Sequence, residues 1–73
     1  MSDLLIKNEA GTRPVATANS NDPIGAQNLR VTNLDPANLI VVGNDYQVGF
    51  DDGTNMRGRT CTAKAGNTAT FVL

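Results

Sequence analysis

The chain has 73 residues, of which 40% are hydrophobic, and its only aromatic side chains are one Tyr and two Phe. Its net charge of −1 excludes the basic surface that binds nucleic acids or anionic membranes. One Cys and no His exclude an intrachain disulfide and a zinc site built from Cys and His. So short a chain forms a single domain, residues 1–73, whose small core needs a partner for stability. We therefore expect copies of the chain, or a larger protein assembly, as partners.

The first third of the chain predicts two short strands separated by turns. Residues 3–7 form an apolar strand, and Gly11 in the following turn supplies a residue at positive φ. Residues 12–18 form a weak strand. Because proline cannot donate a ladder hydrogen bond, Pro14 either places this strand at a sheet edge or precedes its start. Residues 19–23 have the composition of a loop.

Residues 29–50 hold most of the large apolar side chains and predict three consecutive strands that pair as a meander. The first strand, 29–32, alternates apolar and polar residues, and the third strand, 46–50, alternates again. Between them, residues 39–42 form an unbroken apolar run, which is typical of a strand buried on both faces. A turn at residues 35–38 separates the first two strands, because proline presets φ and Asp and Asn bond their own backbone.

The last part of the chain predicts two more strands. Residues 56–63 are rich in Thr, which favours a strand, and residues 68–73 form a final apolar strand. Turn clusters at 51–55 and 64–67 precede them. No stretch repeats apolar residues at helical spacing, so we expect no helix. The predicted fold class is all-β, a small antiparallel sandwich or barrel of about six short strands.

The chain ends on Phe71, Val72 and Leu73, and an exposed apolar strand of this kind would be a template for pairing with another strand. We expect it to be paired, either within the domain or with a neighbouring subunit, and both alternatives are open. The predicted interface residues are Leu4, Ile6, Arg57, Arg59, Phe71, Val72 and Leu73.

Arg57 and Arg59 are two positions apart, so they share one face of the predicted strand. Three interpretations are open. In the preferred one the face is solvated, with at most a weak cross-strand ion pair to Asp51 or Asp52. A subunit interface, where Arg is enriched, is the second interpretation. A clamp for a phosphate or carboxylate is the third.

Residues 51–55, with Asp45 nearby, offer oxygen ligands of the kind that Ca²⁺ prefers. Their spacing does not match the calcium-binding loop of an EF-hand. Asp-Gly between two strands is also a common hairpin signal, so a plain turn is the favoured interpretation. No metal site and no cofactor are predicted.

Cys61 has no His in the chain to activate it, so the sequence favours a small buried hydrophobe over a catalytic nucleophile. The acidic residues are scattered over turns, and their spacing does not support a pair of catalytic carboxylates. There is also no glycine-rich phosphate-binding loop. We therefore predict no catalytic residues and no enzymatic activity.

Two stretches of the sequence resemble small bacteriophage virion proteins. In residues 31–45 a strand ends in an Asn-Leu-Asp turn, an Asn follows, and an apolar run closes on Gly. Residues 65–71, Ala-Gly-Asn-Thr-Ala-Thr-Phe, are similar to the final strand of such proteins, although this chain stops where more strand is expected. The resemblance implies a structural role, such as capsid decoration, a head-fibre base or a tail-associated protein. It brings no catalytic residues with it.

The residues and the resemblance together predict a non-enzymatic virion structural protein that binds a protein lattice, such as a capsid, as an oligomer. We expect synthesis in the host cytoplasm, because residues 1–7 lack the charge and length of a signal peptide and no apolar run would span a membrane. The alternative is a small β-sandwich module that binds a glycan or another ligand through loops 19–23 and 51–55. Neither hypothesis involves nucleic acid or a membrane.

Overall fold

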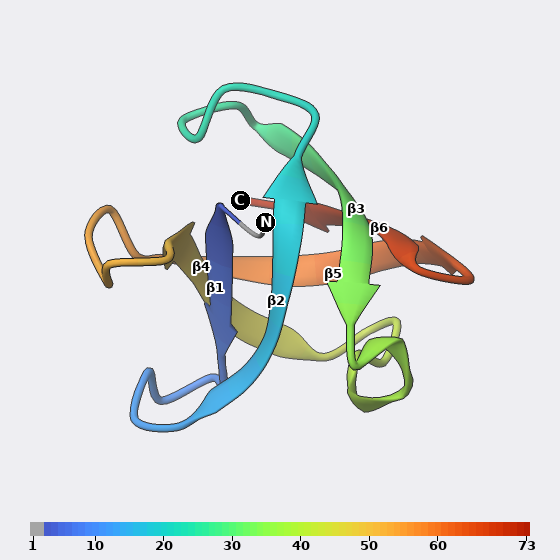
Figure 1. Ribbon diagram of the computed structural model, residues 1–73, viewed down its shortest axis with the longest axis horizontal. Helices are drawn as coiled ribbons and strands as arrows, with labels where there is room; N and C mark the ends of the chain where they lie inside the picture. The colour runs from blue at the N-terminus through green and yellow to red at the C-terminus, as the bar shows by residue number, and fades with distance from the viewer. Residues whose placement is uncertain (1–2) are drawn as a thin grey trace.

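The computed structural model describes residues 3–73 and shows a closed barrel of six antiparallel strands (Figure 1). The strands are β1 (Leu4–Lys7), β2 (Pro14–Ser20), β3 (Asn28–Asp35), β4 (Asp45–Phe50), β5 (Arg57–Ala65) and β6 (Thr68–Val72). They form two meanders, β1-β2-β3 and β4-β5-β6, and the barrel closes because β1 pairs with β4 and β3 pairs with β6. The predicted all-β class and the small antiparallel barrel are confirmed.

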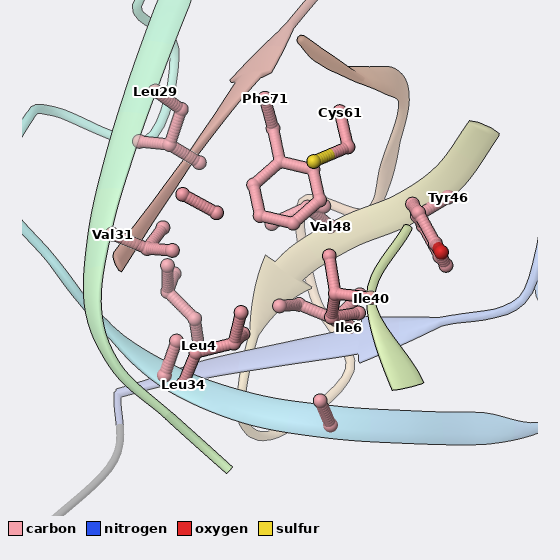
Figure 2. Close-up of a cluster of buried hydrophobic side chains, with 13 residues drawn as sticks. Leu4, Ile6, Leu29, Val31, Leu34, Ile40, Tyr46, Val48, Cys61 and Phe71 are labelled. Atoms are coloured by element: carbon pink, nitrogen blue, oxygen red, sulfur yellow. The ribbon is translucent and has the colours of Figure 1, made fainter. Parts of the chain in front are cut away.

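The core lies inside the barrel and draws side chains from every strand (Figure 2). Alternation explains which side chains enter it, because successive residues of a strand point to opposite faces. In β1, for example, Leu4 and Ile6 are fully buried while Leu5 between them is half-buried. Phe71 fills the middle and meets the ring of Tyr46 edge-to-face, with centroids 5.9 Å apart. Edge-to-face is a favoured geometry for aromatic pairs.

The predicted meander over residues 29–50 is wrong. Strand β3 pairs with β2 and β6, and β4 pairs with β1 and β5, so these two strands are not neighbours in the sheet. Residues 39–42 are not a strand: Leu39 ends the 3-10 helix η1 (Ala37–Leu39), and residues 40–42 continue the connection between the two meanders. Apolar content alone cannot distinguish a short buried strand from such a connection. The barrel is already closed by the other strands, which leaves no place for a further strand here.

Pro14 is the first residue of β2 and lies where the register with β1 shifts, opposite Lys7. The missing amide proton is tolerated at this position, because proline is accommodated at the first residue of a strand and at bulges. Of the two alternatives for Pro14, the sheet edge is excluded, since β2 is paired on both sides, and the strand begins at Pro14 itself.

The apolar C-terminal strand β6 is paired on both sides within the same domain, with β3 and with β5. Beyond it, the Leu73 amide donates to the Gln27 carbonyl at 3.1 Å, and the Gln27 side chain donates to the Leu73 carbonyl at 3.0 Å. Of the two alternatives for this strand, pairing within the domain is the one the fold adopts.

Candidate docking surface

The connection between β3 and β4, residues 36–44, exposes three of the five exposed large apolar side chains of residues 3–73; we call it the apolar loop. Leu39, Val41 and Val42 are each about half exposed, at 51%, 50% and 52%. Ile40 between them is 1% exposed and packs in the core. Ile40 therefore fixes the loop to the barrel, while its neighbours point to solvent.

The hydroxyl group of Tyr46 holds the middle of the apolar loop. It accepts a hydrogen bond from the Val41 amide at 2.8 Å and donates one to the Leu39 carbonyl at 3.4 Å. The Tyr46 ring is itself packed in the core, so this support comes from a buried side chain.

The end of the apolar loop is joined to β5 by two backbone hydrogen bonds. The Gly43 amide donates to the Cys61 carbonyl at 2.8 Å, and the Cys61 amide donates to the Asn44 carbonyl at 3.0 Å. Gly43 has φ +95°, a conformation that glycine adopts without steric cost. The apolar side chains are therefore held on a fixed backbone, which lowers the conformational entropy lost when they bind a partner.

The predicted interface residues are separated by the fold. Leu4, Ile6 and Phe71 are completely buried in the barrel of their own chain, so a partner cannot contact their side chains while the barrel is folded. These side chains point into the core because they are large and apolar, and the same property drew attention to them in the sequence. Leu4, Ile6 and Phe71 are therefore removed from the predicted interface. Val72 is half-buried, and Leu73 is 41% exposed.

Arg59 lies inside one end of the barrel and is only 2% exposed, so the solvated-face interpretation is wrong for this residue. Its guanidinium group donates to the carbonyls of Ile24 and Ala26, both at 2.8 Å, and more weakly to Gln27 at 3.4 Å. It also reaches the carbonyl of Phe71 at 3.2 Å. Arg59 therefore ties the segment before β3 to β6.

The buried guanidinium of Arg59 has no carboxylate partner among residues 3–73, and its Nε atom has no hydrogen-bond partner there. Burial lowers the pKa of Arg59, and the nearby charge of Arg57 lowers it further. Arg57 is exposed, so the two arginines do not form one surface patch. They do not form the clamp of the third interpretation, because the terminal nitrogens of Arg59 donate to backbone carbonyls.

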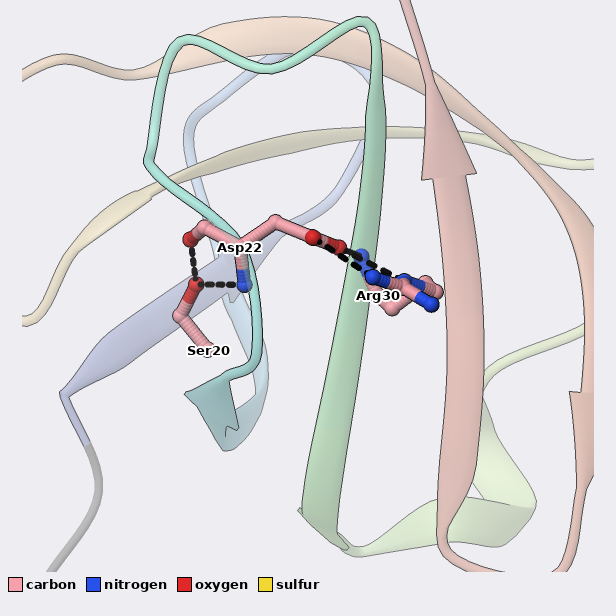
Figure 3. A network of polar contacts seen from close by, with 3 residues as sticks. All are labelled: Ser20, Asp22 and Arg30. Atoms are coloured by element: carbon pink, nitrogen blue, oxygen red, sulfur yellow. Dashed lines mark hydrogen bonds and ion pairs between the residues drawn. The ribbon is translucent and has the colours of Figure 1, made fainter.

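Loop 19–23 uses its polar groups for internal contacts (Figure 3). The Asp22 carboxylate accepts two hydrogen bonds from the Arg30 guanidinium, at 2.9 and 2.8 Å, and one from the Arg30 amide at 2.9 Å. These bonds hold the pKa of Asp22 at about 2. The hydroxyl of Ser20 donates to the Asp22 carbonyl. Few groups of this loop remain for the glycan or ligand of the alternative hypothesis.

Loop 51–55 is a turn in which Asp52, one of its two acidic side chains, is also engaged. One oxygen of Asp52 accepts from the Thr54 amide at 3.0 Å and from the Thr54 hydroxyl at 2.7 Å. These bonds lower the pKa of Asp52. Among residues 3–73, no three His, Cys, Asp or Glu side chains gather as metal ligands.

Cys61 is fully buried, and burial raises the pKa of its thiol. The sulfur donates weakly to the Ala63 carbonyl at 3.6 Å. The predicted burial of Cys61 as a small hydrophobic side chain is confirmed.

The sequence reasoning missed Leu39, Val41 and Val42 as surface residues. The available signal was their position between the turn at residues 35–38 and Gly43, which bounds a run of only four apolar residues. A run of this length suits a connection as well as a strand, and only the pairing of the other strands decides between them.

Comparison of the chain with models of protein families, with curated proteins and with solved structures found no match. Within residues 3–73 the helical content is the short η1, and no helix is long and apolar enough to cross a membrane.

Proposed function

We propose that this chain is a non-enzymatic structural protein of a protein assembly, specifically of a bacteriophage particle, and that the apolar loop is its docking surface. The observation that carries the proposal is the pairing of exposure with rigidity: Leu39, Val41 and Val42 face solvent on a backbone held by Tyr46 and Cys61. Exposed apolar groups of this kind mark protein contact sites.

The size of the apolar loop sets the kind of contact expected. A standard interface buries about 800 Å² on each partner, with a few central apolar anchors that contribute most of the binding energy. The exposed surface of the chain is 3987 Å². One interface would therefore occupy about a fifth of it, and the three apolar side chains are suited to be its central anchors.

The virion assignment is supported by the resemblance of residues 31–45 and 65–71 to phage virion proteins. These two stretches are brought together in the fold, since the Leu34 amide of β3 donates to the Asn67 carbonyl at 2.9 Å. The apolar loop lies within the first stretch. Residues 36–44 therefore belong both to the stretch that resembles phage virion proteins and to the proposed docking surface.

The test is the protein composition of purified particles whose genome encodes this chain, measured by quantitative mass spectrometry. We expect the chain at a fixed ratio to the main shell subunit. The triple variant Leu39→Ser, Val41→Ser, Val42→Ser should be lost from the particles, whereas Leu73→Ser, which removes another exposed apolar side chain, should be retained. Wild-type chain that is abundant in the lysate but absent from the particles would refute the proposal.

A further inference from the structure

A surface hollow of about 270 Å³ lies across β3 and the β5–β6 hairpin. Short side chains leave this space open: its lining includes Ala63, Ala65, Thr68, Ala69 and Thr70. A cavity of about 150 Å³ is enough to hold a benzene molecule. The hollow therefore has room for a branched aliphatic side chain such as Val or Leu.

The β5–β6 hairpin, which carries part of the hollow, and the β3–β4 connection, which forms the apolar loop, lie on the same side of the barrel, at the right of Figure 1. Asn67 in the turn of the hairpin accepts the hydrogen bond from Leu34, two residues before the loop. At its other end, the loop is bonded through Gly43 to Cys61, two residues before Ala63 of the hollow.

The charges beside the loop and the hollow are opposite. Lys64 lines the hollow and has no ion-pair partner among residues 3–73. Asp35, directly before the loop, is exposed and likewise has no ion-pair partner in that part of the chain. The other cation of the hollow, Arg30, is already neutralised by Asp22. Lys64 and Asp35 are therefore free to pair with an opposite charge on another molecule.

We propose that the occupant of the hollow is the apolar loop of a second copy of this chain, in a reciprocal two-fold dimer. In this dimer Val41 and Val42 of each copy sit on the alanine- and threonine-lined hollow of the other, and Asp35 of each copy faces Lys64 of the other. The inference rests on the proposed docking role of the loop and names its partner.

Two-fold symmetry follows from the adjacency of the two surfaces. When a projecting group and its complementary hollow lie side by side, one rotation brings both pairs into contact and closes the assembly. The contact between loop and hollow then occurs twice in each dimer, so the interface buries twice the area of a single such contact. A head-to-tail contact between the same surfaces would form each contact only once per pair.

The first experiment measures the solution mass of the whole chain by light scattering after size exclusion, over a wide concentration range. We expect the mass to rise from 7.7 kDa to twice that value as the concentration rises. The variant Val41→Ser, Val42→Ser should need at least about tenfold higher concentration for the same dimer fraction, because two apolar side chains are no longer buried. Leu73→Ser is the matched control and should dimerise like the wild type.

The second experiment exchanges the proposed charges. Lys64→Glu should weaken the dimer, since it would place two carboxylates together, and the addition of Asp35→Lys should restore it. Arg57→Glu makes the same change in net charge at another exposed site and should leave the dimer unchanged. Restoration by the double variant requires that the two positions face each other, so its failure would overturn the proposed contact.

A chain that stays monomeric at every concentration, or that forms a trimer or larger ring, would refute the dimer. These outcomes are distinguishable from failure of the proposed function. A monomer that is nevertheless present in purified particles would refute only the dimer. A dimer that is absent from the particles would refute only the virion role.

Discussion

Arg59 is a charged side chain in the interior of a small barrel, and its position reflects the needs of the backbone around it. The segment between β2 and β3 leaves carbonyls of Ile24 and Ala26 without a strand partner, and the guanidinium group supplies donors to both. Its planar fork can serve several acceptors at once, which a lysine ammonium on a flexible stem does less well. The cost of burying this charge is offset only while those hydrogen bonds are intact.

Replacement of Arg59 by Ala should lower the free energy of unfolding by about 3 kcal/mol, because buried carbonyls lose their charged donor. Urea denaturation followed by circular dichroism measures the change. Arg57→Ala, at an exposed position of the same strand, serves as the control and should stay within about 0.5 kcal/mol of wild type. Equal midpoints for the Arg59 variant and wild type would contradict the assigned role.

At the scale of elements, the connection from β2 to β3 is held by the pair of Asp22 and Arg30 across the mouth of its loop (Figure 3). The carboxylate binds both the side chain and the amide of Arg30, so it fixes the start of β3 as well as the loop. The Arg30 side chain is 66% exposed and that of Asp22 is 15% exposed, so the ion pair is partly open to solvent, which limits its contribution to stability. The pair is therefore expected to matter most for the local order of the loop.

The Asp22 carboxyl gives a pH dependence of known sign. Its folded pKa of about 2 lies below the value of about 3.9 expected in an unfolded chain, so ionised Asp22 stabilises the fold. This contribution is present above about pH 4 and is lost as the pH falls towards 2. Wild type should therefore exceed Asp22→Asn in thermal stability at pH 5, and the difference should vanish near pH 2.

Calorimetric scans of both proteins between pH 2 and pH 6 would check this expectation. Asp52, whose pKa is also lowered, is present in both proteins and does not affect their difference. A stability difference that is constant over the whole range would show that the Asp22 carboxylate does not act through its charge.

At the scale of the whole molecule, closure of the barrel joins the two meanders through β1 and β4 on one side and through β3 and β6 on the other. The core is small, and its buried side chains come from both meanders (Figure 2). Closure also leaves no unpaired strand edge among residues 3–73, so strand addition is not available as a mode of association. Association must use side chains, which is the reason that the apolar loop is important.

Ile6→Ala distinguishes a core residue from an interface residue. Since Ile6 is fully buried in β1, its truncation should cost about 2–5 kcal/mol and should lower the stability of the monomer itself. Unfolding of dilute protein, where association is negligible, should show the loss by both Tyr fluorescence and circular dichroism. If the variant weakened association but left the monomer as stable as wild type, the original assignment of Ile6 to an interface would be right.

Several local features of this protein followed from the sequence alone, because they depend on neighbouring residues. The apolar run in residues 3–7 and the alternation in residues 46–50 predicted two strands, and the clusters around Gly53 and Gly66 predicted the turns beside β5. The absence of His left Cys61 without a base, which favoured a buried thiol. These inferences need no knowledge of what each segment packs against.

The position of residues 39–42 and the role of Arg59 could not be decided in this way. Four apolar residues in a row fit a buried strand or a connecting loop equally well, and only the pairing of β4 with β1 and β5 excludes the strand. An arginine near the end of a strand is ordinarily exposed. Only the approach of backbone carbonyls from distant segments gives it partners in the interior.

The sequence by itself therefore determined the class of the fold and most of the strands. Only the tertiary structure decided which apolar side chains form the core and which face solvent. The physical reason is that burial depends on contacts between segments far apart in the chain: β1 closes the barrel over Leu4 and Ile6, and the same closure leaves Leu39, Val41 and Val42 outside.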